Sequence, residues 1–193
     1  MTDKLVIALA QLNPTVGKIG ANLEKLRETR KKAANEGADL LLTSELYTCG
    51  YPPEDLVRKP QFISSLRSAV EAFASETNDG GPAVLLGTPW VESDRLHNSL
   101  VLIEGGAITT ARHKYDLPNY GVFDEKRVFD PGAMPGPISF KDVRMGVPIC
   151  EDIWTPEVVE CITETGGEII LVPNGSPYEA GKTDMRGHHA IAR

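Results

Sequence analysis

Cysteine is scarce in this 193-residue chain, which carries only three, at positions 49, 150 and 161. They form no Cys-x-x-Cys pair, and no histidine lies near them at the spacing of metal ligands. The sequence therefore indicates neither a disulfide scaffold nor a zinc site, and we expect no bound metal. Each thiol must then be either a packed core side chain or a reactive nucleophile.

An excess of positive charge and long apolar runs are also lacking. The chain has 27 acidic and 20 basic residues, for a net charge of −7. Such a surface repels phosphate backbones, which argues against nucleic acid as a partner. The longest apolar run near the start, Leu5 to Ala10, is too short for a signal-peptide core or a membrane span. We therefore expect a cytoplasmic protein that makes no membrane contact.

The remaining composition, 41% hydrophobic and 24% charged, is that of an ordinary globular protein, and the length suits one domain over residues 1–193. In the first half, apolar runs that predict strands buried on both faces alternate with helical periods. The expected strands cover Leu5–Ala10, Ala38–Thr43 and Ala83–Thr88, and the helical faces carry Leu23, Leu26, Ala33 and Ala34, then Phe62, Leu66, Val70 and Phe73. This alternation predicts an α/β layered fold.

The second half begins with a predicted β-hairpin that turns at Gly105-Gly106. A long irregular segment follows, and its aromatic and charged residues suggest that it is ordered. The expected elements are the hairpin 98–112, the segment 115–137, a strand Val143–Cys150, a helix capped by Thr155 and ending near Glu164, a buried strand Glu168–Pro173, and a helix that opens at Thr183.

Three reactive residues occupy comparable places: Glu45 and Cys150 each follow a predicted strand, and Lys114 ends the hairpin. Active sites of layered α/β folds collect at such strand ends. A carboxylate could take the proton of a thiol, and an ammonium could hold the oxyanion that forms on attack. Buried cysteines and solvated rim charges are nevertheless the commoner explanation of such residues. Residue types and spacing alone therefore give only a weak indication of cysteine amidase chemistry.

The local sequence around these residues is more specific. Five blocks are Ala10-Gln-Leu-Asn-Pro-Thr-Val-Gly17, Ser44-Glu-Leu-Tyr-Thr-Cys-Gly-Tyr-Pro-Pro-Glu-Asp-Leu56, Lys114-Tyr-Asp-Leu-Pro-Asn-Tyr-Gly-Val-Phe-Asp-Glu-Lys-Arg-Val-Phe129, Cys150-Glu-Asp-Ile-Trp154 and Pro173-Asn-Gly-Ser-Pro-Tyr178. Together they resemble the carbon-nitrogen hydrolase (nitrilase) superfamily and, within it, the amidase domain of glutamine-dependent NAD synthetases. The blocks follow the order of the family and span nearly the whole chain.

The resemblance implies a four-layer α-β-β-α sandwich and a set of site residues. Cys150, Glu45 and Lys114 match the catalytic triad of the superfamily, and Glu125 matches a second acid that orients the lysine and the substrate. The residues that match contacts to the substrate glutamine are Tyr51, Tyr120, Glu151, Ser176 and Lys182. No metal and no cofactor is implied for this chain.

In such enzymes the ammonia passes to a synthetase domain that uses ATP and Mg²⁺, and the chain shows no Ser-Gly-Gly-x-Asp-Ser loop for pyrophosphate. We therefore expect the chain to be a truncated amidase domain that lacks its synthetase partner and forms homo-oligomers when complete. Alone, it should be poorly soluble and little active. Two alternatives stay open at this point: a stand-alone amidase that acts on another small amide, and an inactive fragment.

Overall fold

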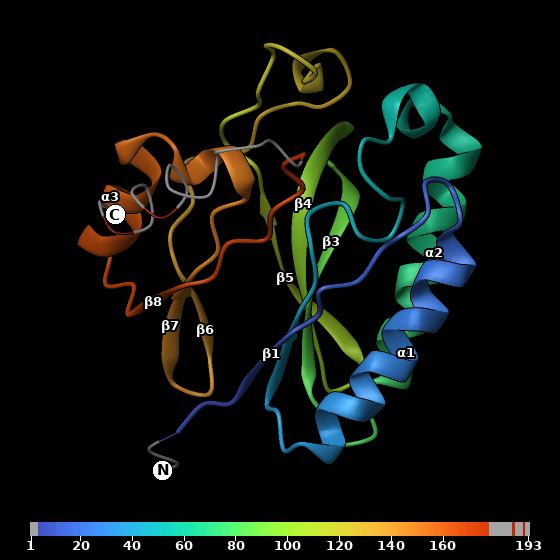
Figure 1. Cartoon of the computed structure of the whole chain (residues 1–193), viewed down its shortest axis with the longest axis vertical. Coiled ribbons are helices and arrows are strands. Elements are labelled where there is room, and N and C mark those ends of the chain that lie inside the picture. The colour runs from blue at the N-terminus through green and yellow to red at the C-terminus, as the bar shows by residue number, and fades with distance from the viewer. Residues whose placement is uncertain (1–3, 178–186, 188–190, 192–193) are drawn as a thin grey trace.

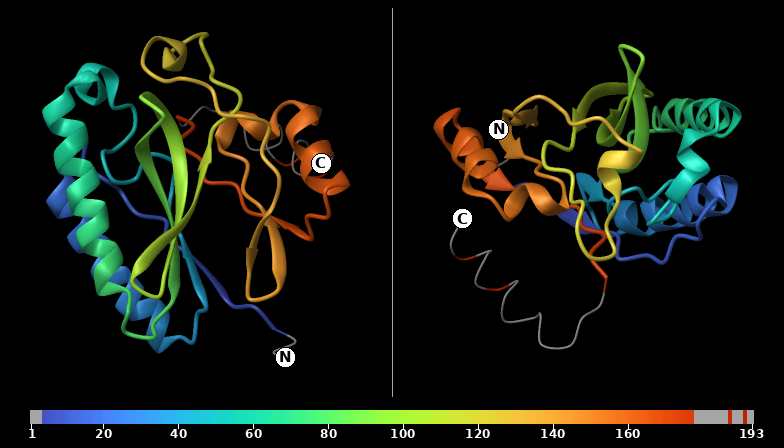
Figure 2. Two further views of the ribbon diagram at one scale, coloured as in Figure 1. Left: turned by 180° about the vertical axis from the view of Figure 1, so that it is seen from behind. Right: turned by 90° about the horizontal axis from the view of Figure 1, so that it is seen from above.

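The computed structural model describes residues 4–177, together with Gly187 and Ile191. Its described part consists of two β-sheets placed face to face, with helices on both outer sides (Figure 1). Helices α1 (Ile19–Asn35) and α2 (Pro60–Glu76) lie side by side on one flank, and α3 (Pro156–Glu164) lies on the opposite flank (Figure 2). The predicted four-layer α-β-β-α sandwich is confirmed.

The first sheet has five strands in sequence order: β1 (Ile7–Leu9), β2 (Leu40–Leu42), β3 (Ala83–Glu92), β4 (Arg95–Glu104) and β5 (Ala107–His113). Strands β1, β2 and β3 are parallel, because α1 and α2 connect them, whereas the β3–β4 and β4–β5 pairs are antiparallel hairpins. The sheet is therefore mixed, with parallel strands along one edge.

The second sheet contains β6 (Ile138–Phe140), β7 (Val143–Gly146) and β8 (Ile169–Ile170). Strand β7 pairs antiparallel with β6 and parallel with β8, and α3 forms the crossover between β7 and β8. Gly146 has no side chain where Ile162 of α3 packs on the strand, since a Cβ there would lie 2.5 Å from an Ile162 methyl. The close approach of α3 to β7 thus depends on this glycine.

Two apolar clusters hold the layers together. The first fills the space between the first sheet and its helices, and includes Leu26, Leu66, Val70 and Phe73. The second lies between the two sheets and joins side chains of β2, β3 and β4 to those of β6 and β7. Its buried members are Leu40, Leu42, Ala83, Leu85, Leu100, Leu102, Ile138, Phe140, Met145, Val147, Ile149 and Cys150. Because strands β2 and β3 pack on both faces, their sequences read as continuous apolar runs.

Three short 3₁₀ turns lie outside the sheets, and two of them carry predicted site residues. They are η1 (Glu54–Arg58), which contains no predicted site residue, η2 (Glu125–Arg127), which begins with Glu125, and η3 (Cys150–Ile153), which begins with Cys150. The described part of the irregular segment 115–137 is ordered, as expected, and its backbone is bonded back to β4 and to Lys114. None of the helices in the described part is long and apolar enough to cross a membrane.

Several expected boundaries and burials are wrong. The strand predicted to run to Cys150 ends at Gly146, and Cys150 instead opens η3. Thr155 is the N-cap residue of α3, as expected, but its side chain makes no capping hydrogen bond, because its hydroxyl donates to Asp116. Strand β8 has two half-buried residues rather than a fully buried run, and Leu9 of β1 is 63% exposed. The predicted helix that opens at Thr183 lies outside the described residues.

Candidate active site

Glu45, Lys114 and Cys150 come from three separate segments and meet at one end of the two facing sheets. Glu45 follows β2, Lys114 directly follows β5, and Cys150 opens η3 beyond β7. All three side chains are buried: Glu45 is 1% exposed, Lys114 0% and Cys150 3%. Charged groups are rarely buried to this degree without a partner of opposite charge. The carboxylates and the ammonium of the cluster must therefore pair with one another.

Lys114 forms ion pairs with two carboxylates at once. Its Nζ donates to Oε1 of Glu45 at 2.7 Å and to both oxygens of Glu125 at 2.9 and 3.0 Å. Burial alone would lower the pKa of Lys114, but the two carboxylates outweigh it and hold the pKa above its ordinary value. The lysine is therefore a fixed ammonium in the centre of the cluster.

Glu125 is a second buried acid beside the lysine. Burial raises its pKa above the ordinary value, while Lys114 acts in the opposite direction. The hydroxyl of Tyr51 donates to Oε1 of Glu125 at 2.9 Å. The structure thus places Tyr51 on Glu125, and the expected contact of Tyr51 with a substrate stays a prediction.

Cys150 lies on a strained elbow. Its φ of +49° lies in the left-handed region, which costs a residue with a side chain about 1–3 kcal/mol. The Cys150 N–H donates to the carbonyl of Pro173 at 3.0 Å, which ties the elbow to the segment after β8. The same segment brings the N–H of Gly175 to 2.9 Å from Oε2 of Glu45. A side chain at Gly175 would collide with that carboxylate, since its Cβ would lie 2.9 Å from Oε2.

The resting thiol of Cys150 is protonated. Burial first, and then the charge of Glu45, raise its pKa to about 12, although Lys114 acts in the opposite direction. The thiol donates to Oδ1 of Asn174 at 3.4 Å and lies 3.9 Å from the hydroxyl of Ser176. A nucleophilic role for this sulfur therefore requires a base that takes its proton as it attacks.

The remaining predicted contacts form the rim. Tyr120, which is 56% exposed, donates its hydroxyl to the Glu151 carboxylate at 2.8 and 3.0 Å. Glu151 directly follows Cys150, and Ser176 lies beside the thiol. The structure thus gathers every predicted site residue that it describes around Cys150. Lys182 lies outside the described residues.

Asn98, in β4, is a member of the cluster that the sequence analysis missed. Its amide donates to Oε1 of Glu45 at 2.7 Å and to Oε2 of Glu125 at 3.3 Å. Its own Oδ1 finds no hydrogen-bond partner among residues 4–177. An unpaired buried acceptor costs about 1–3 kcal/mol, whereas each hydrogen bond to a charged group contributes about 1.5–3 kcal/mol. The two bonds to the carboxylates therefore fix the orientation of the Asn98 amide, although its oxygen stays unpaired. In the sequence, the signal for Asn98 was its polar side chain at the start of the predicted hairpin 98–112, next to an apolar run.

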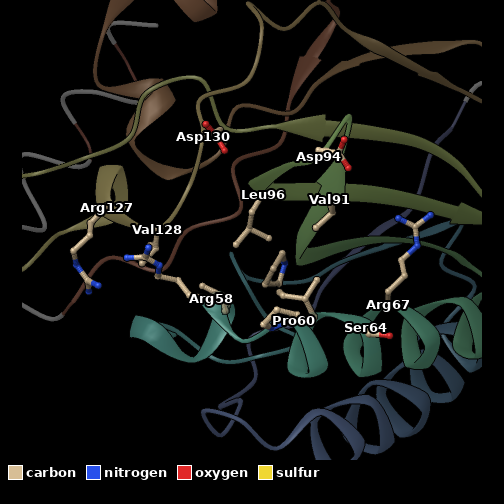
Figure 3. Close-up of a pocket in the computed structure, with 13 residues that line it drawn as sticks. Arg58, Pro60, Ser64, Arg67, Val91, Asp94, Leu96, Arg127, Val128 and Asp130 are labelled. Atoms are coloured by element: carbon tan, nitrogen blue, oxygen red, sulfur yellow. The ribbon is translucent and has the colours of Figure 1, made fainter.

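A groove of about 610 Å³ lies apart from this cluster (Figure 3). Pro60 and Ser64 of α2 line one side, and Val91 and Leu96 of the β3–β4 hairpin line the other. None of the reactive side chains contributes to it. A cavity of about 500 Å³ at the ends of β1 and β2 does border the cluster, through Ser44 and Asn174. We therefore locate the chemistry by its converging ionisable groups rather than by the size of the groove.

Comparison with known proteins identifies the family of the chain. The carbon-nitrogen hydrolase family matches residues 6–192. The chain is 41% identical, over its full length, to a glutamine-dependent NAD(+) synthetase of Rhodobacter capsulatus, of which it covers 35%. It therefore spans about a third of the length of this curated relative.

Two solved structures are similar to the chain. One is a glutamine-dependent NAD+ synthetase from Acinetobacter baumannii in complex with ADP, with a TM-score of 0.88, 36% identity, and coverage of 93% of this chain and 34% of that one. The other is an amidase from Nesterenkonia sp. AN1 that carries a covalent acetamide adduct on its active-site cysteine, with a TM-score of 0.81, 25% identity, and coverage of 97% and 72%. With its fold, its buried cluster and a family match over nearly the whole sequence, the chain belongs to the carbon-nitrogen hydrolase family.

Proposed function

We propose that this chain hydrolyses the side-chain amide of glutamine and belongs to a glutamine-dependent NAD synthetase. The observation that carries the proposal is the buried cluster of a protonated thiol, a lysine and two carboxylates in a chain 41% identical to such a synthetase. The ammonia would serve the ATP- and Mg²⁺-dependent amidation of nicotinic acid adenine dinucleotide elsewhere in the enzyme. The expected homo-oligomer belongs to the same proposal.

In the proposed first step, Glu45 takes the thiol proton while the sulfur of Cys150 attacks the amide carbon. The resulting oxyanion accepts hydrogen bonds from Lys114 and from the backbone N–H of Glu151. One N–H of Lys114 can serve both Glu125 oxygens, and a second serves Glu45, so a third is left for the oxyanion. The lysine can therefore contact the oxyanion without losing either carboxylate.

The second half of the reaction reverses these proton movements. The C–N bond breaks, and Glu45 returns the proton to the departing ammonia. A water then gives a proton to Glu45 and attacks the thioester, and release of glutamate restores the thiol. Glu151, Tyr120, Ser176 and Lys182 are proposed to hold the α-amino and α-carboxylate groups of the substrate.

The test of this proposal is a comparison of amides with the full-length product of the gene. Glutamine should be hydrolysed to glutamate and ammonia at a kcat/KM at least about a hundredfold above that for acetamide or propionamide, because the shorter amides lack the groups that the polar residues of the rim are proposed to bind. A preference for simple amides would instead assign the chain to the stand-alone amidases, which the likeness to the Nesterenkonia enzyme favours.

Asn98 offers a separate test of the carboxylate pair. Asn98→Asp puts a third acid between Glu45 and Glu125, so we expect glutamine turnover at pH 8 to fall about a hundredfold, the range of an electrostatic contact in a water-excluded site. The loss should shrink as the pH falls from 8 towards 6, because burial raises the pKa of Glu125 and a proton on that acid removes one charge and supplies a donor. The measurement is kcat/KM across this pH range.

Asn22→Asp is the matched control, because Asn22 is also fully buried and its amide also donates two hydrogen bonds, in this case to backbone carbonyls away from the cluster. It should lose thermal stability but keep its activity per folded molecule. Equal activity losses in the two variants would show that Asn98 acts only on stability.

A further inference from the structure

Asp152 is a buried carboxylate two residues beyond Cys150 that has no part in the proposed chemistry. Only 1% of its surface is exposed. Its hydrogen bonds come from backbone N–H groups of two different segments. Oδ1 accepts from Tyr115 at 3.1 Å and from Asp116 at 2.7 Å, and Oδ2 accepts from Ile149 at 2.9 Å. One side chain therefore connects the segment 115–116 with the residue that precedes Cys150.

These two segments carry the reactive groups. Tyr115 directly follows Lys114, which extends β5 of the first sheet, whereas Ile149 lies beyond β7 of the second sheet. The Asp152 carboxylate thus spans from one sheet to the other beside both the ammonium and the thiol. A charged acceptor of three N–H groups makes such a link stronger than neutral hydrogen bonds would.

The same carboxylate supports the strained elbow. Cys150 has a φ of +49°, which the chain adopts only where the surroundings fix it. Asp152 bonds across the elbow twice, because its N–H donates to the Ile149 carbonyl at 3.1 Å and its Oδ2 accepts from the Ile149 N–H. The link to residues 115–116 holds this closed turn against the lysine segment.

We propose that Asp152 is a positioning residue that fixes the Cys150 elbow relative to Lys114, so that one substrate carbonyl can reach both the sulfur and the ammonium. This role rests on the proposed function of the site, but it concerns the geometry of the thiol and can be measured without glutamine. A small displacement of reacting groups is sufficient to slow a reaction strongly.

The link should depend on charge. Burial raises the pKa of Asp152 to about 6; its N–H donors and Lys114 act to lower it, and Asp116 acts to raise it. The carboxylate is therefore charged at pH 8 and protonated well below pH 6. In the protonated form one oxygen becomes a donor that faces backbone N–H groups, as the amide of an Asn would. Protonated Asp152 should thus behave like Asp152→Asn.

The experiment compares Asp152→Asn with the unchanged full-length gene product at pH 8 and pH 5. At pH 8 we expect kcat for glutamine to fall at least about tenfold, with KM within about threefold, because the reacting groups rather than the rim are displaced. The rate of Cys150 alkylation by iodoacetamide, measured by mass spectrometry, should fall in parallel. At pH 5 the ratio of the variant to the unchanged protein should approach one, both for kcat and for the alkylation rate.

Asp39→Asn is the matched control, since the Asp39 carboxylate also accepts a backbone N–H bond, from Val6 at 2.8 Å, but lies at β1 and β2 away from the elbow. It should leave both rates within about twofold. If Asp152→Asn fails to fold, Asp152→Ser, which leaves space for a water, takes its place.

The outcomes separate the two proposals. A ratio that stays the same at pH 5 and pH 8, or an Asp152 variant with unchanged alkylation, overturns the positioning role. The unchanged protein could fail to hydrolyse glutamine and still be alkylated faster than Asp152→Asn at pH 8 but not at pH 5. That result supports the positioning role and refutes the proposed function.

Discussion

Cys150→Ala should abolish glutamine hydrolysis, by a factor of about 10⁴ or more, and leave the fold intact. The thiol is protonated at rest, with a pKa of about 12, so its loss removes no buried charge. Its hydrogen bond to Asn174, with 3.4 Å between sulfur and oxygen, contributes little to stability because a thiol is a weak donor. The measurements are glutamate release at saturating glutamine and the thermal transition.

Cys161→Ala provides the control for this variant. Cys161 lies on α3, is partly exposed, and is not part of the cluster around Glu45 and Lys114. Its replacement should leave turnover within about twofold, as for most substitutions away from a functional site. Residual turnover in the Cys150 variant above one hundredth of the unchanged rate would refute the nucleophile assignment.

Lys114→Met should lower turnover at least about a hundredfold, because it removes the ammonium that holds the oxyanion. Methionine fills a similar volume, so the effect is one of charge rather than of packing. The variant should also unfold more readily, since breaking a buried ion pair costs about 3–5 kcal/mol. Glu45 and Glu125 are then left facing each other without their cation.

The stability loss of Lys114→Met should depend on pH in a defined direction. Burial already raises the pKa of Glu125, and without the lysine this rise has no opposing cation. An acid with a raised folded-state pKa favours folding at low pH, and this contribution is lost as the pH rises through that pKa. The melting temperature of the variant, relative to that of the unchanged protein, should therefore recover as the pH is lowered from 8.

Lys141→Met is the matched control, because Lys141 pairs with Asp39 on a half-exposed surface away from the site. It should change neither turnover nor the pH dependence of melting measurably. A Lys114 variant that keeps a third or more of the unchanged turnover would show that the ammonium is not needed for the reaction.

The layered fold could be predicted because its parallel strands are buried on both faces. Runs such as Leu40 to Leu42 and Val84 to Leu86 are fully apolar, and the helical faces of α1 and α2 lie between them. The short elements could not be predicted in the same way. Strand β6, which was not predicted, has three residues, too few for a periodicity of two to stand out. Of the strand predicted over Glu168–Pro173, only the two residues of β8 are paired as a strand.

The site was predictable in part. Glu45, Lys114 and Cys150 stand in sequence blocks that a family resemblance can identify. Asn98 and Asp152 act through contacts between segments that lie far apart along the chain, 53 residues in the case of Asn98 and Glu45. No local pattern encodes such a contact. In the sequence, Asn98 is marked only by its polar character beside an apolar run, and Asp152 only by its place in the block Cys150–Trp154. Neither mark names the partner.

Capture of the covalent intermediate would identify Cys150 as the nucleophile. The full-length product of the gene is mixed with labelled glutamine, quenched in acid within milliseconds and digested. We expect a γ-glutamyl thioester on the peptide that carries Cys150, discharged by hydroxylamine and absent from Cys150→Ala. Glutamine turnover with the label on no peptide, or on a peptide that lacks Cys150, would contradict this assignment.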